Sequence, residues 1–179
     1  MQQRGERVFA MRWSILFVVA AMFATPAARA CGPQVEIRFE EASPDRFAIA
    51  FTRGPKLRLA RLTLSLDGSA AGAVFDDYGG LFLQSPSPSG VAITAVDYAA
   101  PPAMSVTLAF RDFLEKRSVD FRTDLDDRGS DPDQNHLAPG ELEGATARAI
   151  LTDETGRTIE IDGRFDRDSR SLLGERACV

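Results

Sequence analysis

The 179-residue chain has few of the side chains that usually carry enzyme chemistry. It contains one histidine, two cysteines and one tryptophan. No G-x-S-x-G, H-E-x-x-H or phosphate-loop sequence occurs, so nucleophilic catalysis and zinc hydrolysis lack their usual residues. The single histidine, His136, is expected to be an exposed loop residue. These absences favour a non-enzymatic protein.

Amphipathic aromatic side chains are also scarce. Trp13 is the only tryptophan, and Tyr78 and Tyr98 are the only tyrosines. A platform of rings on which a sugar could stack is therefore not expected. Paired carboxylates can still catalyse glycoside hydrolysis, so a carboxylate-dependent periplasmic hydrolase stays open as the alternative function.

No apolar run is long enough to cross a bilayer. The run over residues 13–24 falls short of the roughly 20 apolar residues that a spanning helix needs. Three arginines precede it, Pro26 follows it, and residues 28–30 (Ala-Arg-Ala) fit a cleavage site directly before Cys31. Residues 1–30 are therefore predicted to be a secretory signal peptide, which places the protein in the periplasm or outside the cell, with no transmembrane segment left after cleavage.

Basic residues are fewer than acidic residues in this chain. The whole chain has 21 basic and 26 acidic residues; the leader holds four arginines and one glutamate, which leaves 17 basic against 25 acidic, a net charge of −8. Nucleic acid is an unfavourable partner for such a chain, whereas cations are favoured. Residues 31–179 have the length of a single domain with its own hydrophobic core.

The two cysteines, Cys31 and Cys178, lie at the two ends of the exported part. In an oxidising compartment they are predicted to form a disulfide. Closing so long a loop would stabilise the fold by about 4–5 kcal/mol through the entropy of the unfolded chain. The alternative is lipidation of Cys31, which Arg29 disfavours because a small residue is expected there.

Short alternating runs of apolar and polar residues fill the exported part. They predict strands over residues 35–39, 47–51, 57–66, 106–110, 119–123, 147–151 and 159–165, with less regular strands at 73–75, 81–83 and 91–96. Residues 153–156 indicate a hairpin turn. Helical periodicity never extends beyond about two turns. The pattern predicts an all-β fold, an antiparallel β-sandwich of about eight to ten strands.

The most acidic segment begins at Asp124 and forms a long predicted loop to Gly140. The eighteen residues from Asp124 to Glu141 carry seven aspartate, asparagine and glutamate side chains, and six of them are the candidate metal ligands: Asp124, Asp126, Asp127, Asp131, Asp133 and Asn135. Such crowded carboxylates repel one another, and Ca²⁺, which takes six to eight oxygen ligands, would offset that repulsion. Because side chains alternate along a strand, Asp124 and Asp126 are expected to project from the same side.

The spacing does not match an EF-hand. Asp131, Asp133 and Asn135 fit its first, third and fifth positions, but His136 stands where glycine is required and Leu142 where glutamate is required. A solvated acidic loop without metal therefore stays open. A second acidic pair, Asp76-Asp77, would add ligands if its strand lies beside this loop.

Several segments together resemble a family. They are Asp45-Arg46-Phe47, residues 72–76 (Gly-Ala-Val-Phe-Asp), Val119-Asp120-Phe121 with the acidic motif that follows, and Glu143-Gly144-Ala145. In these the chain resembles small exported bacterial proteins described as similar to the sponge aggregation factor core protein. The resemblance implies an exported β domain related to a Ca²⁺-dependent aggregation proteoglycan, with a cell-surface or envelope protein or glycan as partner and no enzymatic activity. The stretch from Gly129 to Leu137 is longer than the resemblance predicts.

Overall fold

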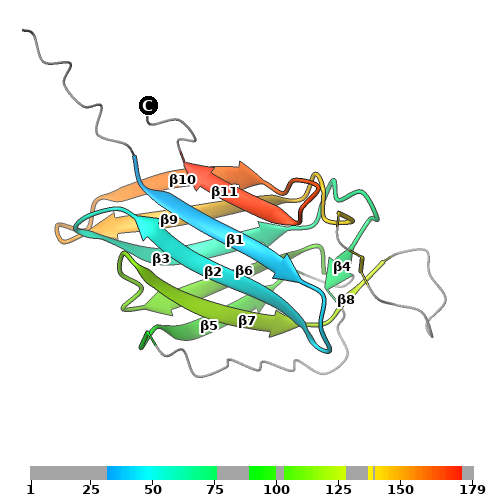
Figure 1. The fold of residues 1–179 in the computed structure, drawn as a ribbon. Coiled ribbons are helices and arrows are strands. Elements are labelled where there is room, and N and C mark those ends of the chain that lie inside the picture. The colour runs from blue at the N-terminus through cyan, green and yellow to red at the C-terminus, as the bar shows by residue number, and fades with distance from the viewer. Residues whose placement is uncertain (1–31, 76–88, 100–102, 128–136, 139, 175–179) are drawn as a thin grey trace, which may run out of the picture.

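The computed structural model describes residues 32–75, 89–99, 103–127, 137–138 and 140–174. In these residues the chain forms eleven strands and no helix, and every strand pairing is antiparallel. Two sheets lie face to face (Figure 1). The predicted antiparallel β-sandwich is therefore confirmed, with slightly more strands than expected.

The strands are distributed over two large sheets and one short ribbon. Sheet A has four strands in the order β11 (Arg170–Gly174), β1 (Gln34–Glu40), β2 (Asp45–Arg53) and β7 (Arg117–Thr123). Sheet B has five in the order β10 (Thr158–Arg164), β9 (Thr146–Asp153), β3 (Leu57–Ser65), β6 (Ser105–Arg111) and β5 (Ala92–Tyr98). The ribbon pairs β4 (Val74–Phe75) with β8 (Leu125–Asp126).

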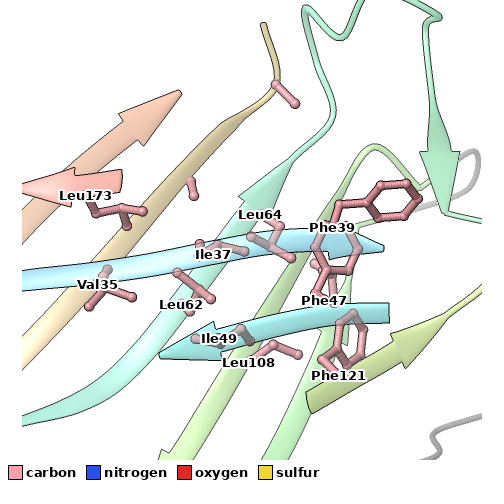
Figure 2. Packing of buried hydrophobic residues seen from close by; sticks show 14 of the residues in the cluster. Val35, Ile37, Phe39, Phe47, Ile49, Leu62, Leu64, Leu108, Phe121 and Leu173 are labelled. Atoms are coloured by element: carbon pink, nitrogen blue, oxygen red, sulfur yellow. The ribbon is translucent and has the colours of Figure 1, made fainter. Parts of the chain in front are cut away.

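The core lies between the two sheets because alternate residues of each strand point inward. On β1 and β2 the inward residues include Ile37, Phe47 and Ile49, all fully buried. Figure 2 shows them facing Leu62, Leu64 and Leu108 of sheet B. Burying a side chain of this size is worth about 1.5–3 kcal/mol, so the alternating pattern supplies the main driving force for the sandwich.

The sandwich is closed along one side and bounded by two edge strands along the other. β9 and β10 form the hairpin expected at residues 153–156. Directly after β10, Phe165 bridges to Ser171 of β11, which joins sheet B to sheet A along that side (Figure 1). A Cβ on Gly163 would lie 2.8 Å from the carbonyl oxygen of Leu172, so only glycine allows this close crossing. β5 and β7 are the opposite edges.

Two strands were not expected from the sequence. β11 is a short run whose inward residues are Ser171 and Leu173, too few for a clear alternation. β8 lies inside the segment that was expected to be a loop, so the prediction of a continuous loop from Asp124 to Gly140 is wrong at its beginning. The predicted strand at residues 81–83 and the predicted signal peptide at 1–30 lie outside the described residues.

Candidate functional site

The acidic residues singled out in the sequence begin at one end of the sandwich. There β1 ends, β2 begins and β7 ends, and the β4–β8 ribbon lies beside them (Figure 1). Phe75 of β4 and Leu125 of β8 are paired and buried, and Phe75 also bridges to Ala103. The ribbon therefore continues the core at this end and fixes where the acidic chain leaves it.

Three of the predicted ligands lie on or beside the ribbon. Asp124 is exposed, and Asp126 and Asp127 are partly buried, on either side of the fully buried Leu125. Asp126 of β8 is in register with Val74 of β4. The other three, Asp131, Asp133 and Asn135, lie outside the described residues, as does His136.

A further carboxylate, Asp45, lies beside these residues. It is the first residue of β2, in register with Thr123 at the end of β7, and only 4% of its surface is exposed. One oxygen, Oδ1, accepts a hydrogen bond from the backbone N–H of Ala42 at 3.2 Å, and Oδ2 accepts one from Leu125 at 3.2 Å. Asp45 thus connects the β1–β2 turn to the start of the acidic segment.

The environment of Asp45 disfavours its charged form. Burial is the main cause and raises the pKa of Asp45 to about 6, against an ordinary value of 3.8. The two backbone hydrogen bonds oppose this shift, whereas the nearby carboxylates of Asp124 and Glu41 add to it. Asp45 and Asp124 therefore form a carboxylate pair with no arginine or lysine against it among the described residues.

The strand predicted over residues 47–51 does not include Asp45, so the sequence analysis missed this role. A signal was present, because the inward residues Phe47, Ile49 and Phe51 follow Asp45 at two-residue intervals. Strand alternation therefore places Asp45 on the buried face. A buried aspartate at the start of a strand requires hydrogen-bond donors, and the two backbone N–H groups supply them.

The described carboxylates do not by themselves complete a metal site. No group of three or more histidine, cysteine, aspartate or glutamate side chains in the described ranges is arranged to hold an ion. The fold does bring together the two strands of the ribbon, because β4, which ends at Phe75, pairs with β8, which carries Asp126. The second acidic pair, Asp76-Asp77, follows Phe75 in the sequence. Asp76 and Asp77 themselves are outside the described residues.

The two predicted disulfide partners, Cys31 and Cys178, also lie outside the described residues. The described strands next to them are neighbours: Gln34 at the start of β1 is in register with Gly174 at the end of β11. A Cβ on Gly174 would lie 2.2 Å from the carbonyl oxygen of Pro33. The chain therefore enters and leaves the sandwich at the same place.

Comparison with known proteins gives no further assignment. No known protein family, no curated protein and no solved structure matches the chain. In the part of the chain that the structure describes, no helix has the length and hydrophobicity needed to cross a membrane.

Proposed function

We propose that the chain is an exported, non-enzymatic β-sandwich that binds Ca²⁺ at the end formed by β4 and β8 and serves as an interaction module of the cell envelope or surface. The observation that carries the metal part is the carboxylate pair of Asp45 and Asp124. Burial is the main cause of the raised pKa of Asp45 and the charge of Asp124 adds to it, so a bound cation beside these two carboxylates would offset the repulsion between them.

The proposed ligands are the predicted oxygen donors, Asp124, Asp126 and Asp127 first, with Asp131, Asp133 and Asn135 completing the shell. Ca²⁺ accepts such flexible oxygen ligands at about 2.3–2.6 Å. Asp45 is placed as a supporting group, because both of its oxygens already accept backbone hydrogen bonds. The resemblance to the aggregation-factor-like proteins supports the surface role, with an envelope protein or glycan as partner.

The experiment that tests the metal site is thermal unfolding of the protein purified from the periplasm of an expressing host. Melting in millimolar CaCl₂ is compared with melting in EGTA. At 100 times the dissociation constant, Ca²⁺ adds about 2.7 kcal/mol, which for a domain of this size raises Tm by several degrees. We expect this shift, and we expect it to disappear in a variant with Asp124, Asp126 and Asp127 all changed to Asn.

The matched control is Asp97→Asn, which removes an exposed carboxylate from β5 of sheet B. This variant is expected to keep the full response to Ca²⁺. Equal melting temperatures in CaCl₂ and EGTA for the unmodified protein would refute the metal site and favour an envelope component without a metal.

A carboxylate-dependent hydrolase is the second candidate, and the raised pKa of Asp45 is the observation that favours it, because catalytic acids have such values. A catalytic acid must also reach its substrate. Asp45 is buried and its oxygens are engaged with Ala42 and Leu125, which supports a structural role instead. Hydrolysis of a glycan by the protein, lost in Asp45→Asn, would reverse this choice.

A further inference from the structure

The end of the sandwich opposite the β4–β8 ribbon carries a group of basic side chains (Figure 1, left). The β2–β3 and β6–β7 turns meet there, because the backbone N–H of Lys116 donates to the carbonyl oxygen of Phe51 at 2.7 Å. Arg58 also forms a β-bridge with Leu114. Six basic side chains on these turns and the adjoining strand ends, here called the basic end, form no ion pair with a described residue: Arg53, Lys56, Arg58, Arg111, Lys116 and Arg117.

The carboxylates at this end do not neutralise the group. Asp112 and Glu115 belong to the β6–β7 turn and Glu154 belongs to the β9–β10 hairpin. Asp153 of the same hairpin is already paired with Arg157 at 3.5 Å. Basic side chains are therefore in excess here, although acidic residues outnumber basic ones in the exported part. Because the predicted calcium ligands lie at the other end, the protein would approach a negatively charged surface with the basic end first.

An apolar side chain stands among these cations. Leu114 is 40% exposed, and it is the only exposed large hydrophobic side chain in the part of the chain that the structure describes. The preceding residue, Phe113, is fully buried, with its ring centroid 5.1 Å from that of Phe110 and 6.5 Å from that of Phe51. Because Phe113 anchors the turn in the core, Leu114 is held outward, on the same turn as the exposed Lys116.

A hollow of about 260 Å³ lies beside this turn. It is lined by Arg58 and Arg111, both exposed, and Asp112 is the one carboxylate among the residues around it. The short side chain of Ala60 leaves room between the strands. Since a guanidinium matches a phosphate group in geometry, the two arginines could bind a lipid headgroup while Leu114 contacts the acyl chains.

The described chain also begins at this end. Arg53 of the basic end donates from Nε to the carbonyl oxygen of Gly32 at 2.9 Å. The predicted signal peptide precedes Gly32 in the sequence. The apolar region of such a peptide is held in the membrane until it is removed, so the basic end would lie beside the lipid headgroups during export. This placement favours a lipid surface over other negatively charged partners.

We propose that the basic end docks the exported protein on an anionic lipid surface, with Leu114 entering the boundary between headgroups and acyl chains. Buried apolar area and attraction of basic residues to anionic lipids are the two contributions to such binding. The proposal rests on the proposed location in the envelope, but it does not require the calcium site, which lies at the opposite end.

The test is co-sedimentation of the protein purified from the periplasm with vesicles of phosphatidylcholine and phosphatidylglycerol, in EGTA. Vesicles of phosphatidylcholine alone are the reference. We expect binding to the anionic vesicles only, decreasing as NaCl is added. Lys56→Gln combined with Lys116→Gln should weaken binding about 30-fold, the effect of two basic residues near an anionic surface. Leu114→Ser should weaken it several-fold.

The matched control is Arg164→Gln combined with Arg167→Gln, which removes the same charge from exposed positions at the end with the ribbon. It should keep full binding, and an unchanged Tm verifies the fold of each variant. The proposal is wrong if the protein does not sediment with anionic vesicles or if both double variants lose binding equally. Full binding by Leu114→Ser would also overturn it, because charge alone would then explain the association.

Discussion

At the scale of single residues, two positions have roles that the alternation of apolar and polar residues along a strand does not predict. Gly144 has a φ of 95°, and a Cβ there would lie 2.2 Å from the carbonyl oxygen of Gly68. Only glycine adopts this conformation and allows this approach. Asp45 is the other such residue, because it is a buried carboxylate held by two backbone donors.

Asp45 makes a testable contribution to the pH dependence of stability. Its pKa is raised in the fold to about 6, so the stability that it contributes is fully present below its unfolded value near 3.8 and is lost as pH rises through about 6. In calcium-free buffer, the stability of the unmodified protein relative to Asp45→Asn should therefore decrease between pH 4 and pH 7. Urea unfolding at each pH measures this difference, and a difference that stays constant over the range would contradict the assignment.

At the scale of elements, the sandwich depends on short strands that have little sequence signature of their own. β11 has five residues, yet it forms one edge of sheet A and is joined to β10 through the bridge between Phe165 and Ser171. Its Leu173 is fully buried in the core and is in register with Val35 of the neighbouring strand β1 (Figure 2). β11 therefore closes the sandwich along this side and contributes a core residue.

This role predicts a large difference between two neighbouring leucines of β11. Leu173→Ala should destabilise the protein by about 2–5 kcal/mol, because it removes a fully buried side chain and leaves a cavity. Leu172→Ala, on the partly exposed outer side of the same strand, should cost less than half as much. Midpoints of urea unfolding at an unchanged m-value measure both; equal losses would show that β11 is not part of the core.

At the scale of the whole molecule, the surfaces differ in how their charges are compensated. The carboxylates Asp45 and Asp124 gather at the end with the β4–β8 ribbon, whereas the outer face of sheet A holds two in-register pairs of arginines. Glu36, Glu40 and Asp120 compensate three of these arginines, whereas Asp45 and Asp124 form no ion pair with a described residue. The end with the ribbon is therefore the surface where a bound cation would offset like charges.

The pairing of β1 with β11 also bears on the predicted disulfide. Because Gln34 and Gly174 are neighbours, only short segments separate them from Cys31 and Cys178. The protein recovered from the periplasm should begin at Cys31 and have a mass about 2 Da below that of the dithiol, since a disulfide lacks two hydrogens. Reduction should then lower Tm. A lipid adduct on Cys31, or two free thiols in the native protein, would contradict the prediction.

The sequence by itself determined the class of fold. The alternation of apolar and polar residues along a strand is visible in the sequence without knowing which strands pair with each other. Residues such as Ile37, Phe47 and Leu108 could be assigned to a buried face from their spacing alone. It also located the acidic segment that begins at Asp124, because a cluster of like charges in sequence is visible without any structure. The alternation and the acidic cluster both depend only on residues that are close together in the sequence.

The tertiary structure alone decided which strands are neighbours and which side chains meet between them. Arg46 and Arg122 are 76 positions apart, and Asp45 and Leu125 are 80 apart, yet each pair is in contact or in register. Periodicity carries no information about strand order, so neither the arginine pair nor the role of Asp45 as a tether could be derived from it. Long-range pairing of strands creates both arrangements, and for that reason they appear only when the chain is folded.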